Sequence, residues 1–253
     1  MKQLVIVFII FLLPNCLKAQ EIKSLIAESV LLEKSGLYEN ALVKYEEILK
    51  LYPNNEIAIC KSSELNATIG DFTESNPARK KYFEKAYSLA KKCIILYPNS
   101  AEANYVFGMS MAKLTDVVSV KEKMKYVKEI KKYAEKALLI NNNHVLSLYL
   151  LGKWHLEICN LSFTEKTAVN LLFGGLPNAS LSEAISNFEK IKKLNPYFIA
   201  NYVELAKSYH INNNPQLAKD ILKSVAKIDI RTANDSIYKI QALKLLDQYN
   251  KFK

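Results

Sequence analysis

The chain has 253 residues, of which 50% are hydrophobic and 24% are charged, so it can bury one substantial core. With 6 Gly and 7 Pro it has too few turn formers for a many-stranded sandwich or barrel, and a disordered or collagen-like chain is also excluded. The formal net charge of +10 comes almost entirely from lysine, because arginine occurs only at Arg79 and Arg231. Lysine suits a solvated surface better than bidentate phosphate recognition, so no nucleic-acid partner is expected.

Residues 1–19 have the three-part layout of a secretory signal peptide. Lys2 gives a positive start, residues 4–13 form an unbroken apolar run, and Ala19 is a small residue at the cleavage position. The run is shorter than the roughly 20 apolar residues that span a bilayer. We therefore expect cleavage after Ala19 and an exported protein, periplasmic or secreted. The alternative is an uncleaved N-terminus that anchors the chain to a membrane.

An internal repeat organises residues 20–253. Its marker is a helix end such as Leu51-Tyr52-Pro53-Asn54, where Pro stops one helix and Asn caps the next. Twelve residues before the five markers stand Ala41, Ala86, Ile130, Ala184 and Ala218. The facing helices carry a small residue at a matching offset, at Ser29, Ser63, Gly108, Gly152 and Ala206.

The small residues have a packing role, because two antiparallel helices approach closely only where a side chain is missing. Pro196 to Ile230 spans 34 residues, the length of a tetratricopeptide unit. The sequence therefore predicts an all-α fold in one domain. We expect a tetratricopeptide-type α-solenoid of about five helix pairs with insertions and a C-terminal capping helix.

Three insertions lengthen the earlier units. We expect loops near residues 70–80, with Asp71, Asn76 and Pro77 among the loop residues, and near residues 115–125. The third insertion, residues 159–178, is long enough for a helix of its own. Ser162-x-x-Glu165 is a capping box that opens it, and Ser180-x-x-Glu183 is a second box that opens the next helix.

The last helix is expected over about residues 234–249. Apolar residues recur there at helical spacing, and they would form the face that docks on the preceding pair: Ile237, Ile240, Leu243, Leu246 and Tyr249. A helix with one docked and one wetted face is what the end of a solenoid requires.

From about Pro77 to Ile230 the sequence resembles the regulator of microtubule dynamics family. The specific part runs through Leu151-Gly152-Lys153-Trp154, Leu161-Ser162-Phe163 and Glu183-Ala184, and it includes the insertion that generic tetratricopeptide repeats lack. The resemblance implies an irregular tetratricopeptide-type domain without enzymatic activity that works through protein association. For animal members it implies attachment to microtubules or organelle membranes, whereas this chain is expected to begin with a cleavable export signal.

The first helix of each pair lines the concave face of such a solenoid, and we expect the partner-binding groove there. By repeat offset its residues are Tyr105, Met109, Lys113, Tyr149, Lys153, Glu204, Lys207 and His210. Lys153 and Lys207 occupy the same repeat position, so their ammonium groups could hold a peptide carboxylate while the tyrosines supply apolar contact. The alternative is that these are ordinary solvent-facing side chains.

Residues 121–136 are rich in lysine. The basic patch consists of Lys121, Lys123, Lys125, Lys128, Lys131, Lys132 and Lys136. It could give a weak contact with an anionic membrane surface or an acidic partner. The alternative is a solvated helix face whose local partners are Glu122, Glu129 and Glu135.

The sequence shows no catalytic motif and no metal-ligand spacing. Cys60, Cys93 and Cys159 are expected as buried apolar residues, with a Cys60–Cys93 disulfide as the alternative in an oxidising compartment. Trp154 is expected in the core. We therefore expect a non-catalytic protein-binding scaffold without cofactor or metal, and the alternative function is a membrane-anchored organiser related to the microtubule regulators.

Overall fold

The computed structural model describes residues 20–173, 175 and 177–251, and these residues form helices joined by short connections, with no strand among them. The predicted all-α fold is confirmed. The predicted signal segment, residues 1–19, lies outside the described residues. Within the described ranges, no helix combines the length and the apolar character that a membrane span needs.

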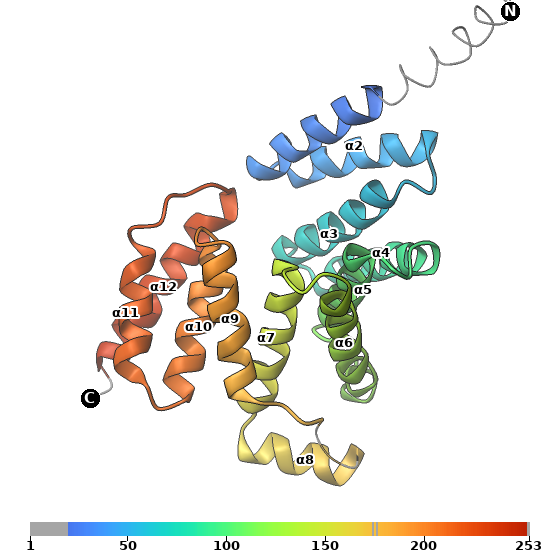
Figure 1. Ribbon diagram of the computed structural model, residues 1–253. Coiled ribbons are helices and arrows are strands. Elements are labelled where there is room, and N and C mark those ends of the chain that lie inside the picture. Colours follow the sequence, from blue (N-terminus) through green and yellow to red (C-terminus); the bar gives the residue numbers. More distant parts are fainter. Residues whose placement is uncertain (1–19, 174, 176, 252–253) are drawn as a thin grey trace, which may run out of the picture.

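A first helix over residues 20–34 is followed by the others in chain order (Figure 1). They are α2 (Tyr38–Leu51), α3 (Glu56–Phe72), α4 (Asn76–Leu96), α5 (Ala101–Leu114), α6 (Val120–Ile140), α7 (Val145–Cys159), α8 (Phe163–Phe173), α9 (Leu181–Leu194), α10 (Ile199–Ile211), α11 (Pro215–Val225) and α12 (Ala233–Lys251).

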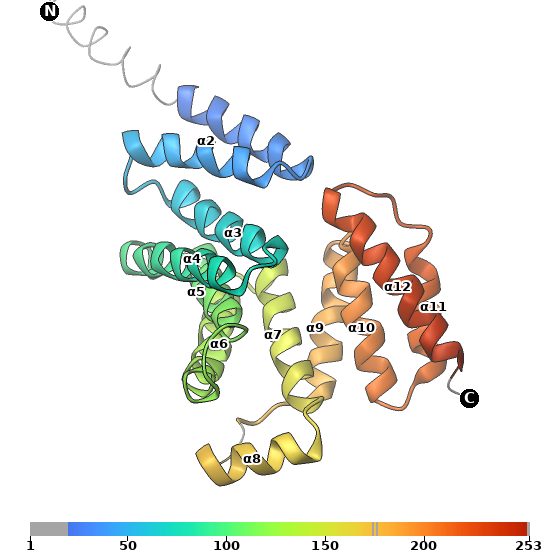
Figure 2. The ribbon, with the colours of Figure 1, turned by 180° about the vertical axis from the view of Figure 1, so that it is seen from behind.

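The helices form two rows (Figures 1 and 2). The inner row consists of residues 20–34, α3, α5, α7, α10 and α12, and its members from α3 onward contact the next inner helix directly. The outer row consists of α2, α4, α6, α9 and α11, and each outer helix packs on the inner helices before and after it. This is the stacking of helix pairs that the repeat predicts.

The small residues of the repeat lie where the helices of a pair meet. Ser63 is fully buried, and its Oγ donates a 2.8 Å hydrogen bond to the carbonyl of Ala86, the predicted partner position on α4. A Cβ at Gly108 would lie 3.1 Å from Leu150 Cδ2 and 3.5 Å from the carbonyl oxygen of Ile130. Ser29 and Ala206 are also fully buried. The predicted register is confirmed.

The first two insertions lengthen helices instead of forming long loops. Asp71 is still in α3, while Asn76 and Pro77 open α4, so only residues 73–75 connect them. Helix α6 begins already at Val120, and α4 and α6 each have 21 residues where α2 has 14. The prediction of loops at residues 76–80 and 120–125 was therefore wrong, because Pro fits the first turn of a helix and Ser119 with Glu122 forms a capping box.

The third insertion contains α8, as predicted. The Ser162 amide and hydroxyl both donate to Glu165 Oε2, at 2.8 and 2.7 Å, and Ser162 Oγ accepts from the Glu165 amide, which confirms that box. The second box is only half formed, because Ser180 Oγ caps the Glu183 amide while the Ser180 amide donates to His155 Nδ1 at 3.1 Å. Glu183 Oε2 instead lies 2.8 Å from His155 Nε2.

Helix α12 caps the row, and only the C-terminal part of the predicted face is docked, because Tyr249 is buried and Leu246 packs against the core. Ile237, Ile240 and Leu243 are exposed, whereas Ala242 and Tyr249 are buried against α10 and α11. The docked stripe recurs every seven residues, at positions 235, 242 and 249. Counting apolar residues alone misassigned the N-terminal part of the face, because the docked stripe there includes Asp235, whose carboxylate accepts the amides of Arg231 and Thr232.

The two ends of the solenoid meet. Gly36, in the turn between residues 20–34 and α2, has φ +79°, and a Cβ built on it would lie 2.8 Å from the Cβ of Ala233 at the start of α12. Both views show the beginning of α12 beside the turn that precedes α2 (Figures 1 and 2). Burial raises the pKa of the neighbouring Tyr38, and Tyr238 of α12 adds to the increase.

Candidate functional site

The inner row brings charged side chains and tyrosines from α3, α5, α7, α10 and α12 to one side of the molecule. The groups that surround Tyr238 of α12 come from three other inner helices. Burial raises the pKa of Tyr238, while Lys153 of α7 acts in the opposite direction, and Asp71 of α3 and Glu204 of α10 add to the increase. Helices that are distant in sequence thus face one another across the inner side.

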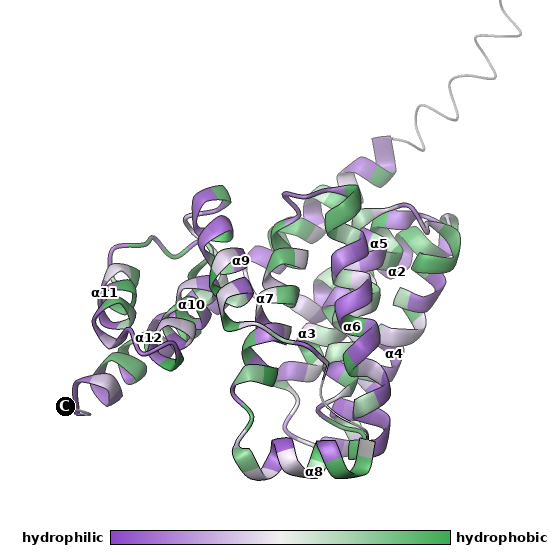
Figure 3. Cartoon of the chain, turned by 60° about the horizontal axis from the view of Figure 1, so that its bottom comes forward, coloured by the Kyte–Doolittle hydropathy of each residue, from purple (hydrophilic) through white to green (hydrophobic). Residues whose placement is uncertain are grey.

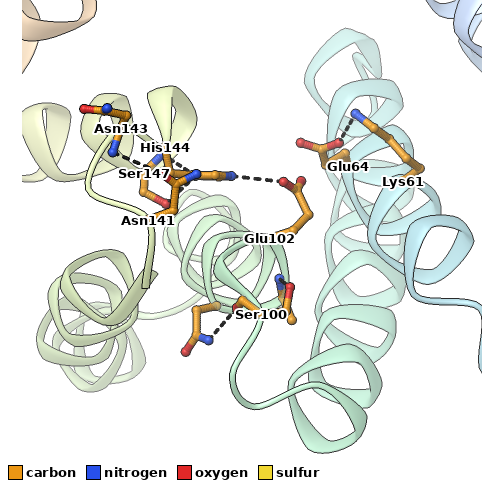
Figure 4. Close-up of polar contacts among 10 residues, drawn as sticks. Lys61, Glu64, Ser100, Glu102, Asn141, Asn143, His144 and Ser147 are labelled. Carbon is orange, nitrogen blue, oxygen red and sulfur yellow. Dashed lines mark hydrogen bonds and ion pairs between the residues drawn. The ribbon is translucent and has the colours of Figure 1, made fainter. Parts of the chain in front are cut away.

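The N-terminal half of this inner side carries a cluster of charged groups around Lys61 of α3, whose pair with Glu64 is drawn in Figure 4. Lys61 Nζ lies 2.6 Å from Glu64 Oε2 and 3.9 Å from Glu33 Oε2. The hydroxyl of Tyr45 donates a 2.9 Å hydrogen bond to Glu33. Burial raises the pKa of Glu64, although the charge of Lys61 opposes this, so the carboxyl group is held where desolvation favours its protonated form.

A carboxylate–imidazole pair lies next to this cluster and joins α5 to α7. His144 caps α7 and accepts the Ser147 amide on Nδ1 at 3.2 Å, so its ring proton is on Nε2. That nitrogen lies 3.0 Å from Glu102 Oε2, and Figure 4 shows the two side chains pointing toward each other. The ring of Tyr105 packs beside His144, with centroids 5.5 Å apart.

Tyr105 connects the two clusters. It is buried, and burial raises the pKa of its phenol well above the ordinary value, with further contributions from the charges of Glu64 and Glu102 and a hydrogen bond to Glu64. Its hydroxyl therefore stays protonated and can donate to a carboxylate. The arrangement offers hydrogen bonds and fixed charges to a ligand, and it contains no activated nucleophile.

The C-terminal half carries the two lysines of the predicted groove. Lys153 lies 3.5 Å from Glu157 of its own helix, and Lys207 lies 3.0 Å from Glu204 of its own helix. Burial lowers the pKa of Lys153, but Glu157 and Glu204 outweigh it and the pKa is raised. Both ammonium groups already contact a carboxylate, and a ligand carboxylate would have to share them.

The structure brings together most of the predicted groove residues, but not all of them are free to bind. Met109 is buried in the core, and Tyr149 packs between Phe188 and Phe198, with centroids 6.0 and 4.9 Å away. Lys113 is paired with Asp71 at 2.5 Å, and His210 stacks on Tyr249 at 3.9 Å.

Sequence reasoning missed several inner residues, among them Glu33, Lys61, Glu64, Glu102 and Tyr238. Glu64 lies one position after the small residue Ser63, as Lys153 and Lys207 lie one position after Gly152 and Ala206. The repeat offset that selected the two lysines therefore also selects Glu64. Tyr238 carries no such signal, because α12 belongs to no complete pair.

The basic patch lies on α6, outside the inner row. Lys131 pairs with Glu135 at 3.6 Å and Lys132 with Glu129 at 3.1 Å. In the described part of the chain, no ion pair is formed by the remaining five lysines: Lys121, Lys123, Lys125, Lys128 and Lys136. The local-partner interpretation thus holds for Lys131 and Lys132.

Buried polar and sulfur groups elsewhere are structural. Trp154 is buried as predicted and donates to the carbonyl of Val127 at 2.7 Å. Cys60 and Cys93 are free, buried thiols, and a hydrogen bond from one to the other, followed by burial, raises the pKa of Cys60. Among residues 20–173, 175 and 177–251, no group of three His, Cys, Asp or Glu is placed to hold a metal ion.

Comparison with known proteins identifies relatives over most of the chain. The model of the family "Regulator of microtubule dynamics protein 1-3" matches residues 25–250. Regulator of microtubule dynamics protein 1 from Mus musculus is 24% identical over 224 residues, covering 87% of this chain and 73% of that protein. Protein 3 from Xenopus laevis is 26% identical over 216 residues, covering 82% of this chain and 47% of its own length.

Solved structures share the fold. A thermophilic TPR protein from Thermus thermophilus superposes with a TM-score of 0.64 at 14% identity, covering 88% of this chain and 98% of its own. PilF from Pseudomonas aeruginosa gives a TM-score of 0.54 at 14% identity, covering 91% and 89%. At this identity the likeness shows the tetratricopeptide-type fold alone.

Proposed function

Because the chain belongs to the regulator of microtubule dynamics protein 1-3 family, we propose that it is a non-catalytic scaffold that holds a protein or peptide partner on its inner side. The observation that carries the proposal is the convergence of ion pairs and tyrosines from five inner helices on one side. A solenoid with this fold offers an extended surface for a partner segment.

The charges of the inner side indicate the chemistry of the partner segment. The α3–α5 half has the carboxylates of Glu33, Glu64 and Glu102 against the ammonium group of Lys61. The α7–α10 half presents Lys153 and Lys207, which form ion pairs with Glu157 and Glu204. We propose that basic side chains of the partner bind the first half and that a carboxylate of the partner is shared by the two lysines.

An affinity pull-down with the full chain tests this proposal. The variant Lys153→Glu/Lys207→Glu changes the inner side, and Lys91→Glu/Lys193→Glu makes the same charge change on the exposed surface of the outer helices α4 and α9. The scaffold proposal expects a partner that is recovered with wild type and with the outer variant and is lost with the inner variant. Equal recovery with both variants would contradict it.

The N-terminal residues 1–19 decide where the protein is expected to be located. We propose export after cleavage behind Ala19, supported by the apolar run of residues 4–13. The alternative is a membrane-anchored organiser, in line with the relatives' name as regulators of microtubule dynamics. N-terminal sequencing of the chain from its native compartment separates the two, because Gln20 as first residue supports export and an intact Met1 supports the anchor.

A further inference from the structure

Helix α8 stands apart from the two rows of helices. It extends beyond the C-terminal end of α7 and lies at the same end of the molecule as the α5–α6 connection (Figures 1 and 2). Helix α8 has few contacts with neighbouring helices, whereas each of the helices α2 to α7 and α9 to α12 packs extensively on its neighbours. Packing within the protein therefore does not explain the apolar side chains of this 11-residue helix.

One half of the circumference of α8 carries no charge and faces solvent. At about 100° per residue, six exposed side chains fall on this half. They are Phe163, Thr164, Thr167, Ala168, Leu171 and Leu172. Phe163 is 85% exposed, Leu171 80% and Leu172 71%. The other half carries Glu165, Lys166 and Val169, of which the last two are partly buried.

The unpaired lysines of the basic patch begin beside this helix. Figure 3 shows the end of the molecule with α8 and its hydrophobic residues next to the hydrophilic α6. Hydrogen bonds from Ser162 lower the pKa of Glu165, and the nearby charge of Lys123 on α6 contributes to the same shift. Val120, the first residue of α6, is 62% exposed as well.

The charge at this end is positive. Lys121, Lys123, Lys125 and Lys128 are exposed and form no ion pair among the described residues. The nearby carboxylates of Glu122 and Glu165 accept hydrogen bonds in capping boxes with Ser119 and Ser162. Asp116, in the connection before α6, is 3.7 Å from Arg79.

We propose that the uncharged half of α8 and the lysines at the start of α6 form a docking surface for an anionic phospholipid bilayer. An apolar helix face that lies in the membrane interface next to a cluster of lysines is the known physical basis of peripheral binding. The positive charge of the unpaired lysines is complementary to anionic lipid headgroups, and the exposed Phe and Leu side chains can enter the apolar part of the bilayer interface. The proposal does not depend on the inner side.

Vesicle co-sedimentation of the full chain tests the proposal. The probes are vesicles of phosphatidylcholine alone and vesicles of phosphatidylcholine with phosphatidylglycerol. We expect binding to the anionic vesicles that weakens with salt. Lys121→Glu/Lys125→Glu should weaken it on the order of a hundredfold or more, because each lysine near an anionic surface contributes about tenfold or less and reversal adds repulsion. Lys91→Glu/Lys193→Glu, with the same net charge, should retain binding.

The apolar contribution is tested separately. Phe163→Ser/Leu171→Ser/Leu172→Ser should reduce binding at least about tenfold, and Ile95→Ser/Leu139→Ser/Leu243→Ser, which replaces three exposed apolar residues elsewhere, should not. Thermal unfolding verifies that both variants fold. In a chain carrying Phe163→Trp, the emission of the new indole should shift to shorter wavelength only with anionic vesicles.

Three results would overturn the proposal. One is equal binding of wild type and both α8–α6 variants, which would assign membrane binding to another part of the chain. Another is binding to neither kind of vesicle. The third is a dimer in analytical ultracentrifugation that the α8 triple variant dissociates, without lipid binding, which would assign the apolar face to a second copy of the chain.

Discussion

Gly152 and Phe188 are in direct contact across the α7–α9 seam. A Cβ at Gly152 would lie 2.6 Å from Cε1 of the Phe188 ring, which is fully buried. The side-chain amide Nδ2 of Asn201 on α10 donates to the carbonyl of Phe188 at 2.9 Å, so α9 is held from both sides. The missing side chain at Gly152 therefore determines how closely the two helices of this pair, α7 and α9, approach each other.

Gly152→Ala should destabilise the protein, because the ring of Phe188 is enclosed and cannot move away. We expect a loss on the order of 1 kcal/mol or more, since overpacking outweighs the helix propensity of Ala. Gly108→Ala is the matched control, because the nearest atom is the flexible Cδ2 of Leu150 at 3.1 Å, and its effect should stay within about 1 kcal/mol of zero. Urea unfolding measures both. Equal losses would contradict the assignment of the seam.

Gly36 and Ala233 close the solenoid. Gly36→Ala places a side chain in the left-handed region, which costs roughly 1–2 kcal/mol, and also against Ala233. Adding Ala233→Gly should recover the steric part of this loss, so the double-mutant cycle should show a favourable coupling. Hydrogen exchange should rise at the start of α12 in the single variant. If the two substitutions change the unfolding free energy additively and hydrogen exchange at α12 is unchanged, the two ends of the solenoid are not in contact in solution.

His155 should make the stability depend on pH. Burial lowers its pKa below the ordinary value of about 6.5, and its Nδ1 accepts the Ser180 amide, so the folded protein holds a neutral ring. The unfolded chain binds the proton more readily. Stability from this group is therefore present above about pH 6.5 and is lost as the pH falls below that value.

The variant His155→Asn isolates this effect, because its amide oxygen can accept the Ser180 amide without titrating. Unfolding free energies measured across this range should fall more steeply for wild type than for the variant. Parallel curves, or a wild type that gains stability on acidification relative to the variant, would contradict a neutral buried His155.

The thiols should differ in reactivity. Cys60 and Cys93 are buried, and the pKa of Cys60 is raised, so a thiol reagent should modify neither in the folded protein. Cys159 is partly exposed at the end of α7, and burial raises its pKa, so it should react slowly. Peptide mapping after alkylation identifies the labelled residues. Fast labelling of Cys60 in the native state, or a Cys60–Cys93 disulfide in the purified protein, would contradict this arrangement.

The sequence predicted the local features of the fold because they are encoded at fixed spacing. Ser63, Gly108 and Gly152 could be placed in the seams from the repeat alone. The loops expected at residues 70–80 were misassigned because Pro77 fits the first turn of a helix as well as a loop. The docked face of α12 was predicted correctly only at its C-terminal end, because apolar spacing could not show that Ile237 and Ile240 have no helix to pack against.

The candidate site was only partly predictable. The repeat offset found Tyr105, Lys153 and Lys207 on the inner side. It could not show that each lysine already contacts a carboxylate of its own helix, since ion pairing depends on rotamers and on neighbouring helices. The repeat offset could not predict the contact between Gly36 and Ala233 either, because this contact depends on the summed curvature of all the helix pairs.

Crosslinking and mass spectrometry of the full chain in its native compartment tests the central claim most directly. If the inner side holds the partner, links from the partner should concentrate at Lys61, Lys113, Lys153 and Lys207, and the outer lysines Lys91 and Lys193 should give few. Links that occur mainly at the outer lysines, or an inner side that links to no other protein, would contradict the account.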